Sequence, residues 1–364
     1  MSGKPLHVVM TADPYIPVPP LHYGGIERVI DVHVRELARR GHRVTLIAHP
    51  ESRIDARLIP YGRPPHTGRI DRAVEVGQVA QALWRLRREA DVVHSFGRLM
   101  AMLPILPLRN LPKVQTYQRR IPWTSVRHAT RLAGRSLVFT GLAGWMERTR
   151  PCGLEGAGEC RTIFNSVDTS RYTLVETVAS DAPLMFLGRL ERIKGTHNAI
   201  AIARGAGRRL VIAGNRVNEG PDAGYFDTEI APHIDGHQIQ YIGPVDDTQK
   251  NAWLGRAAAL LMPIEWEEPF GIVMVEACAC GTPVIAFNRG SVPDVIRPGV
   301  NGFACDGVDD AVRAVGALGS IDRRAVRADC EARFSGDVIA KEYESLYREL
   351  IARTRPDAVR RRAA

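Results

Sequence analysis

The chain has 364 residues, of which 45% are apolar and 24% charged, and this length and composition suit two globular domains with buried cores. Its formal net charge is +9, and residues 1–170 hold 25 Lys+Arg against 14 Asp+Glu, so the positive excess lies in the first half. The most apolar stretch, residues 99–108, is interrupted by two prolines and is too short to span a bilayer. The six cysteines lack the C-x-x-C spacing of a zinc site, and reduced thiols in a cytoplasmic protein are the simplest interpretation.

Apolar, strand-like runs alternate with amphipathic helical stretches along the whole chain. In chain order, these strand-like runs are residues 6–10, 42–48, 91–95, 113–117, 136–140, 184–188, 209–214, 239–243, 259–263 and 283–287. The alternation predicts an α/β fold with parallel sheets and crossover helices, repeated to give two Rossmann-like, doubly wound domains. A polar stretch interrupts the pattern between residues 165 and 182, and we expect the domain boundary there.

Two cations fall in one loop of the second half. The segment LMFLGRLERIKG, residues 184–195, reads as a strand and a loop, and a helix is expected to start at Thr196. Arg189 and Lys194 lie in this loop, where cations are unfavourable next to a helix N-terminus unless an anion lies between them. A diphosphate would be such an anion. The alternative is that the charge is used locally, in a pair with Glu191.

The segment EPFGIVMVE, residues 268–276, places two carboxylates around the start of another helix. Glu268 precedes a proline, which favours an extended conformation in the incoming loop. The helix is expected to run from Gly271 to Cys280 and to stop at the Gly-Thr-Pro that follows. Glu276 therefore lies inside a helix that is apolar nearly all round and should be buried.

A carboxylate buried at Glu276 needs a partner, because its transfer out of water without hydrogen bonds is costly. The vicinal hydroxyls of a ribose could donate two hydrogen bonds. The alternative is that an internal Lys or Arg pairs with Glu276 and that Glu268 is only a loop residue. The free amides from Phe270 to Ile272 form a partly positive helix start that suits phosphate or sugar oxygens.

Taken together, these motifs resemble the family-4 retaining glycosyltransferases of GT-B architecture, over nearly the whole chain. Besides the two segments described, the resemblance includes YGGIERVI at residues 23–30, FNSVD at 164–168, GTPVIAF at 281–287, GSVPDVI at 290–296 and GVNGF at 299–303. It implies two Rossmann-like domains that face a central cleft. Their limits would be residues 1–168 for the acceptor side and 169–336 for the donor side, with a last helix at about 337–364 packing back on the first domain.

For the donor nucleotide, the resemblance implies binding to the second domain. Glu276 would bind the ribose, while Glu268 and the backbone of Phe270, Gly271 and Ile272 would hold hydroxyls of the donor sugar. We expect UDP-glucose as the donor, with GDP-mannose next.

The resemblance also implies how the diphosphate is held. Arg189 and Lys194 would neutralise it, and Gly24 and Gly25 of the first domain would close over it. The chain contains no Asp-x-Asp, so we expect no metal site and no cofactor, and protein groups would stabilise the charge of the leaving diphosphate. The family retains the anomeric configuration, with a donor phosphate oxygen taking the acceptor proton.

One departure from the family pattern concerns the fourth strand of the first domain. Relatives commonly carry a Thr-x-His there whose histidine contacts the donor sugar, whereas this chain has Gln118 at that position. Glutamine can hydrogen-bond a hydroxyl but does not titrate. Gln118 would then serve binding only, or this branch differs in its choice of acceptor or sugar. His94 at a neighbouring strand end could replace the histidine, although a lone strand-end histidine is more often structural.

The densest basic segment is residues 118–135. With Ile121 and Trp123 it could lie on an anionic membrane or bind an anionic acceptor, and the alternative is a solvated basic surface. No nucleic-acid motif is present, so nucleic acid is an unlikely partner. The expected function is a hexosyltransferase acting on a small-molecule, glycan or lipid-linked hydroxyl acceptor. The alternatives are a non-catalytic sugar-nucleotide binding protein and a sugar-nucleotide epimerase.

Overall fold

A computed structural model describes residues 4–21, 24–62, 68–154 and 156–355. The chain forms two compact units, which we call the N-terminal domain (Met1–Ser166 with Gly336–Ala364) and the C-terminal domain (Val167–Ser335). The sequence predicted that the two domains end at residues 168 and 336. In the structure they end at Ser166 and Ser335, two residues and one residue earlier. At the first limit, the Val167 amide donates to the Phe334 carbonyl at 2.8 Å, which ties Val167 into the C-terminal domain.

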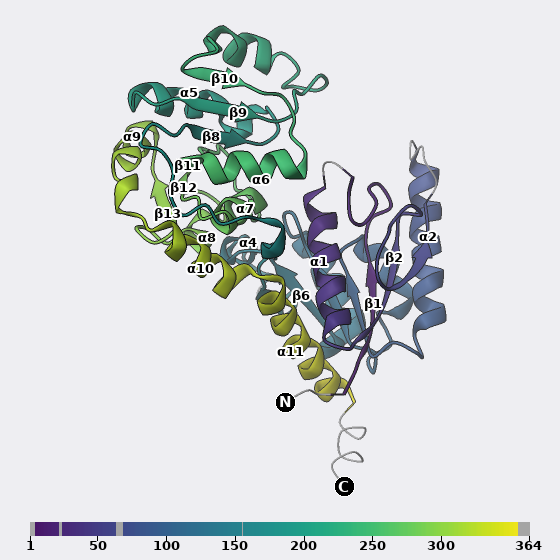
Figure 1. Ribbon diagram of the computed structural model, residues 1–364. Coiled ribbons are helices and arrows are strands. Elements are labelled where there is room, and N and C mark those ends of the chain that lie inside the picture. The colour runs from purple at the N-terminus through teal and green to yellow at the C-terminus, as the bar shows by residue number, and fades with distance from the viewer. Residues whose placement is uncertain (1–3, 22–23, 63–67, 155, 356–364) are drawn as a thin grey trace. The chain divides into compact units, whose positions relative to one another are not determined.

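The N-terminal domain contains a parallel sheet in the order β3-β2-β1-β4-β5-β6-β7. Its strands are β1 His7–Thr11, β2 Arg43–Ala48, β3 Arg57–Pro60, β4 Val92–Ser95, β5 Lys113–Thr116, β6 Leu137–Gly141 and β7 Cys160–Thr162. Its α-helices are α1 Gly25–Arg39, α2 Arg69–Leu86, α3 Trp123–Ala133, α4 Gly144–Arg148 and α11 Gly336–Thr354, with 3-10 turns η1 Leu99–Ile105 and η2 Gly134–Ser136. Figure 1 shows α1 and α2 beside this sheet.

The C-terminal domain contains a second parallel sheet, in the order β10-β9-β8-β11-β12-β13. Its strands are β8 Leu184–Leu187, β9 Leu210–Ala213, β10 Ile239–Tyr241, β11 Ala259–Met262, β12 Val284–Phe287 and β13 Gly302–Cys305. Its α-helices are α5 Thr196–Gly205, α6 Asp247–Arg256, α7 Ile272–Ala279, α8 Val292–Val295, α9 Val308–Gly316 and α10 Arg323–Phe334. Short turns of other helix types are η3 Thr169–Arg171, η4 Arg192–Lys194, η5 Phe226–Ile230, η6 Ala231–His233 and η7 Leu318–Ser320.

The two parallel-sheet α/β domains confirm the predicted fold class. All ten strand-like runs of the sequence contain strands of these sheets, and most strands are buried along their length because helices cover both faces. In each sheet the chain order reverses once, between β1 and β4 in the first and between β8 and β11 in the second. Ligands of doubly wound sheets bind at the carboxyl ends of the strands at such a switch point.

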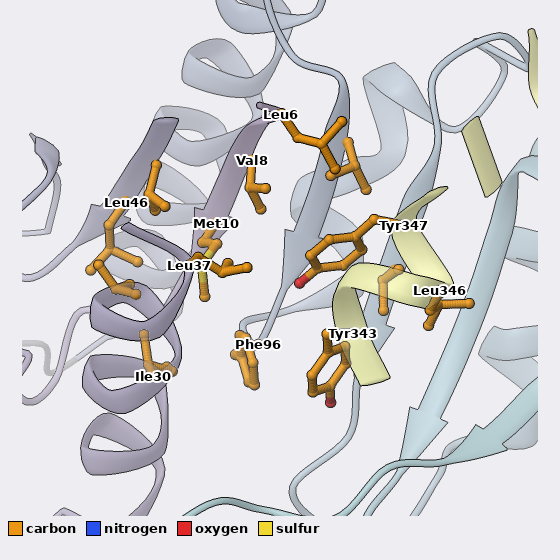
Figure 2. Close-up of a cluster of buried hydrophobic side chains, with 14 of the residues drawn as sticks. Leu6, Val8, Met10, Ile30, Leu37, Leu46, Phe96, Tyr343, Leu346 and Tyr347 are labelled. Carbon is orange, nitrogen blue, oxygen red and sulfur yellow. The ribbon is translucent and has the colours of Figure 1, made fainter. Parts of the chain in front are cut away.

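The core of the N-terminal domain joins segments from both ends of the chain. Helix α11 contributes a buried face whose residues are one or three positions apart, as a helix packed on a sheet requires: Ile339, Ala340, Tyr343, Leu346, Tyr347 and Leu350. Figure 2 shows Tyr343, Leu346 and Tyr347 of this helix together with apolar residues of β1 and α1. Within the described residues, no helix combines the length and apolarity that crossing a membrane requires.

Candidate active site

The cations and the loop carboxylate picked out in the sequence lie at the switch point of the C-terminal sheet. Arg189 and Lys194 are in the connection from β8 to α5, and Glu268 is in the connection from β11 to α7. Because β8 and β11 are adjacent parallel strands, both connections leave the sheet at the same edge. The structure thus brings together Lys194 and Glu268, which are 74 positions apart in the sequence.

Lys194 and Glu268 form a direct ion pair. Lys194 Nζ lies 2.6 Å from Glu268 Oε2, and the Trp266 indole N–H donates to the same oxygen at 2.9 Å. Lys194 Nζ also lies 4.7 Å from the centroid of the Trp266 ring, within range of a cation–π contact. The two charged side chains are only 21% and 13% exposed, so the pair is partly shielded from water.

Arg189 forms a local ion pair with Glu191, which is the alternative that the sequence left open. Its guanidinium lies 2.8 Å from Glu191 Oε1, and the Arg189 side chain is 46% exposed. The second oxygen of Glu191 is buried and has no hydrogen-bond partner among the described residues. Arg189 is thus half exposed, whereas the Glu191 carboxylate that it contacts is mostly buried.

Two glycines allow the loops to approach closely. Gly195 has a φ of +74°, and a Cβ there would lie 1.8 Å from the Pro263 carbonyl oxygen, at the end of β11. Gly290 has a φ of +57°, and its Cβ would lie 2.3 Å from the Glu268 amide nitrogen. Any side chain at either position would push apart the segments that carry Lys194 and Glu268.

Helix α7 starts one residue later than expected, at Ile272, with Gly271 as its N-cap at a φ of +71°. The Phe270 side chain is 2% exposed and packs edge-on against Phe334, with the ring centroids 5.9 Å apart. Phe270 can therefore serve a ligand only through its backbone, as do Gly271 and Ile272 at the helix start. The helix ends at Ala279 with Cys280 as the C-cap, close to the predicted end.

Glu276 is buried, as predicted, with an exposure of 5%. However, its Oε1 accepts hydrogen bonds from Lys250 Nζ at 2.6 Å and from Tyr172 Oη at 2.7 Å. The expectation that the carboxylate relies on a ligand for its partner is therefore corrected, because the internal lysine that the sequence left as an alternative is present on α6. Both donors share one oxygen, so hydrogen bonding by Oε2 to a ribose stays a prediction.

Gly24, Gly25 and Gln118 are three of the site residues that the sequence predicted in the N-terminal domain. Gly24 is the N-cap of α1 and Gly25 is its first residue, while Tyr23 of the same motif lies outside the described residues. Gln118 forms a reciprocal pair with Asn165 of the FNSVD segment, in which each amide nitrogen donates to the other's oxygen at 2.9 Å. Gln118 is thus held in a fixed orientation by Asn165.

His94 is fully buried on β4, and both ring nitrogens contact hydroxyls of the same domain. Nδ1 lies 2.6 Å from Tyr347 Oη and Nε2 lies 2.7 Å from Thr116 Oγ1. His33 of α1 contacts the same Tyr347 hydroxyl at 2.9 Å. This network joins α1, α11 and the sheet, and it corrects the suggestion that His94 replaces the sugar-binding histidine.

The basic segment does not present its apolar residues to solvent. Ile121 and Trp123 are 2% and 4% exposed, the Trp123 indole N–H donates to Thr149 Oγ1 at 3.2 Å, and Arg150 lies over the ring. The two apolar side chains are therefore not available to a membrane surface, because the domain core already buries them, and the suggested association of the segment with a membrane stays a prediction. Arg119 and Arg120 of the same segment are exposed.

Three contributors to the site were missed in the sequence: Trp266, Lys250 and Tyr172. Trp266 lies two residues before Glu268, and its proximity was the one local signal that could have revealed it. Lys250 and Tyr172 lie 26 and 104 positions from Glu276, and nothing in their local sequence indicates the contact. No cluster of three or more His, Cys, Asp or Glu with metal-binding geometry occurs in the described part of the chain.

Comparisons with known proteins identify the family of this chain. The model of the glycosyltransferase family 4 domain matches residues 23–153, and that of glycosyl transferases group 1 matches residues 178–325. A glycogen synthase of Mycobacterium tuberculosis is 26% identical over 393 aligned positions, covering 90% of this chain and 92% of that protein. The fold, the paired switch-point loops and these matches define a glycosyltransferase.

Solved structures show the same two-domain fold. AviGT4, a glycosyltransferase involved in avilamycin A biosynthesis, superposes with a TM-score of 0.69 at 25% identity, covering 96% of this chain and 98% of that one. The Anabaena protein Alr3699/HepE in complex with UDP and glucose superposes with a TM-score of 0.69 at 16% identity, covering 94% of this chain and 100% of that one. The chain belongs to the family-4 glycosyltransferases of GT-B architecture.

Proposed function

We propose that this glycosyltransferase transfers a hexose from a nucleoside diphosphate sugar to a hydroxyl acceptor with retention of the anomeric configuration and without a metal ion. UDP-glucose is the favoured donor and GDP-mannose the next. The observation that carries the proposal is the pairing of Lys194 with Glu268 at 2.6 Å, beside Arg189 at the switch point of the C-terminal sheet.

Charge explains what the two cations do. When the bond between the anomeric carbon and the diphosphate breaks, negative charge develops on the leaving diphosphate. Arg189 and Lys194 supply preorganised positive charge for it, and the amides at the start of α7 add donors. These groups perform the neutralisation that a divalent metal performs in other sugar-transfer enzymes.

Glu268 has two roles in this proposal. It fixes the Lys194 ammonium group before the donor binds, because Trp266 and Lys194 both bond to its Oε2. Its carboxylate also accepts hydrogen bonds from hydroxyls of the donor sugar, together with the Gly271 backbone region. A group that bonds both the cation and the sugar couples donor orientation to charge neutralisation.

No protein nucleophile is required for retention. The acceptor hydroxyl attacks the face that the diphosphate leaves, and a donor phosphate oxygen takes the hydroxyl proton. The new carbon–oxygen bond forms as the bond to the diphosphate breaks, and the nucleotide leaves with the proton. The glucose and UDP in the Alr3699/HepE complex and the name of the glycogen synthase relative support glucose as the transferred sugar.

The test is a transfer assay with UDP-glucose and GDP-mannose, in EDTA, with and without hydroxyl acceptors. We expect acceptor-dependent nucleotide release that EDTA does not abolish, and a product whose anomeric proton coupling matches that of the donor. An inverted product, or release that EDTA abolishes, would contradict the mechanism. Donor binding without release would indicate a binding protein, and donor conversion without an acceptor would indicate an epimerase.

Peripheral association with an anionic membrane is a weaker proposal that now rests on charge alone, because Ile121 and Trp123 are buried. Attraction of the basic N-terminal half to anionic lipid is screened by salt. Binding to phosphatidylserine vesicles that persists at high salt, or in the Arg119→Glu, Arg120→Glu variant, would contradict it.

A further inference from the structure

Glu265 contacts the loop from β8 to α5 on both sides of Lys194. Its backbone N–H donates to the Ile193 carbonyl at 2.8 Å, and its Oε1 lies 3.1 Å from His197 Nε2. The Asn198 amide nitrogen donates to the same carboxylate oxygen at 3.0 Å. Ile193 directly precedes Lys194 and His197 follows it by three positions. The lysine therefore lies between two contacts that the loop makes with one residue.

Glu265 belongs to the other loop of the site, the connection from β11 to α7. Glu268 lies three positions further along this loop, and its carboxylate is 2.6 Å from the Lys194 ammonium group. The two loops are thus joined once through Lys194 and Glu268 and a second time through Glu265. A change at the second junction would shift the two charged groups relative to each other.

His197 is oriented by the hydroxyl of Tyr225. The Tyr225 oxygen accepts the His197 backbone N–H at 3.1 Å and lies 2.7 Å from His197 Nδ1. Burial raises the pKa of Tyr225, so its hydroxyl is protonated at neutral pH and donates to Nδ1. In a neutral imidazole, Nε2 then carries the hydrogen and donates to Glu265 Oε1. These contacts are mutually consistent and fix the orientation of the ring.

Tyr225 also supplies a cap that helix α5 does not have in its own sequence. The N-cap of α5 is Gly195, where a Cβ would lie 1.8 Å from the Pro263 carbonyl oxygen. The close approach of the two loops requires glycine there, and a glycine has no side chain that could accept a helix amide. The Tyr225 hydroxyl accepts the His197 N–H instead, which satisfies an amide of the first turn.

The segment after Tyr225 supports the same loop at another residue. Tyr225 is 4% exposed and directly precedes η5, a π-helical turn, which is a rare conformation that occurs often at functional sites. Glu229 of this turn forms an ion pair with Arg192, whose guanidinium lies 5.3 Å from the centroid of the Tyr225 ring. This segment therefore contacts the Lys194 loop through Arg192 and through His197.

The contact between His197 and Glu265 is expected to contribute little to folding. The two side chains are 26% and 38% exposed, and a pair of this kind adds little to the free energy of unfolding. Its position beside Lys194 gives it a different effect. A charged group that stabilises a ligand or a transition state acts fully only when the surrounding contacts hold it in place.

We propose that His197 is a positioning residue for the donor diphosphate, and that it acts through Glu265 by holding the loop of Lys194 against the loop of Glu268. This inference rests on the proposed binding of a nucleoside diphosphate at Lys194. His197 itself needs no contact with the donor. Its effect should therefore disappear when Lys194 is absent.

The experiment measures the affinity of the full-length protein for UDP and GDP in EDTA by ligand-observed NMR, which follows weak binding. With the nucleotide that binds more tightly, His197→Ala should weaken binding by about tenfold. In the Lys194→Ala background, the same substitution should change the affinity by less than about twofold, because the group that it positions is gone. A role in folding alone would weaken binding equally in both backgrounds.

Two conservative variants separate the ring nitrogens. His197→Gln can place an amide N–H where Nε2 donates to Glu265, and it should bind the nucleotide within about threefold of the wild type. His197→Asn places its amide near Nδ1, which faces Tyr225, and should bind as weakly as His197→Ala. Glutamine carries no charge, so its rescue would also exclude direct attraction of the diphosphate by a protonated ring. The matched control is His237→Ala, at an exposed histidine of the same domain, which should bind as the wild type does.

Unchanged nucleotide binding in His197→Ala would overturn the proposal. An equal loss with and without Lys194, or a rescue by asparagine but not by glutamine, would do the same. The transfer assay on these variants distinguishes this proposal from the transferase function. Coupling of His197 to Lys194 in nucleotide binding, in a protein that transfers no sugar, would contradict the transferase function and leave the positioning role standing.

Discussion

Lys194 and Glu268 illustrate how much of the proposed chemistry depends on single residues. Their charged groups are 2.6 Å apart, and each is mostly shielded from water. Removing Lys194 would leave the carboxylate without its cation, at the place where the donor brings further negative charge. The two residues should therefore not be equivalent: loss of the cation should harm donor use more than loss of the anion.

We predict that Lys194→Ala lowers kcat/KM for the donor by about 10²- to 10³-fold, as removal of one group that stabilises a developing charge does. Glu268→Gln should have a smaller effect, because the amide still accepts a hydrogen bond from Lys194. The matched control is Arg209→Ala, which breaks an exposed pair with Asp181 in the same domain and should change activity by less than about twofold. Wild-type activity in Lys194→Ala would remove Lys194 from the site.

The buried histidines make a prediction about pH. Burial lowers the pKa of His33 to about 3 and holds that of His94 well below its usual range. Below about pH 6.5 the unfolded chain binds protons at these positions that the folded protein does not, so stability falls as the pH falls toward 3. Each histidine contributes a slope of about 1.4 kcal/mol per pH unit.

Urea unfolding between pH 7 and pH 4 measures this slope. In His33→Asn the dependence of the free energy of unfolding on pH should weaken by about one proton. An identical pH dependence in the wild type and in His33→Asn would show that His33 is protonated in the folded state as readily as in the unfolded state.

At the scale of elements, the loop from β8 to α5 is shaped by its closeness to β11. Gly195 and Gly207 flank α5, and both have positive φ, +74° and +61°. A Cβ at Gly195 would lie 1.8 Å from the Pro263 carbonyl, whereas a Cβ at Gly207 would meet nothing within 4 Å. A substitution at Gly207 therefore measures only the cost of the left-handed backbone conformation. The same substitution at Gly195 adds the cost of the steric contact with Pro263.

We predict that Gly207→Ala costs about 1–2 kcal/mol of stability, the penalty of the left-handed conformation. Gly195→Ala should cost more than about 3 kcal/mol and should also raise the donor KM, because Lys194 moves with the loop. Chemical denaturation and donor kinetics on both variants check this. Equal costs for the two substitutions would show that the approach to Pro263 is not a constraint.

The elements also show what could be predicted from the sequence. Period and composition place the ten predicted strands, the helix that starts beside Gly271 and the helix after Lys194, because these depend on local patterns. Strands β3, β7 and β13 were not predicted, since β3 and β13 are only partly buried and β7 is three residues long. The contacts of Glu276 with Lys250 and Tyr172 were not predicted either, because they form only when distant segments pack.

Two further side chains were misjudged for the same reason. His94 follows a strand pattern at a sheet edge where ligands bind, yet α11, some 250 positions later, covers it with Tyr347. Trp123 looks like a membrane anchor in a basic segment, yet it packs into the domain with Thr149. In both cases the sequence shows the chemistry of the residue but not the segment that covers it.

At the scale of the whole molecule, the two domains share a plan and differ in charge. Each sheet has one switch point, and polar groups gather at both. The C-terminal switch point presents Arg189 and Lys194, which suit a diphosphate. The N-terminal one is lined by the carboxylates of Asp13 and Glu75.

The measurement that tests the central claim most directly is the thermal shift of the wild type, Glu276→Gln and Glu276→Ala with UDP, GDP, ADP and TDP in EDTA. We predict a selective stabilisation by UDP, of about 2.7 kcal/mol at a hundredfold excess over Kd, that both variants largely lose. Each variant is compared with its own unliganded midpoint, since Lys250 loses one of its charged partners. No stabilisation by any nucleotide, or an undiminished UDP shift in both variants, would contradict the account.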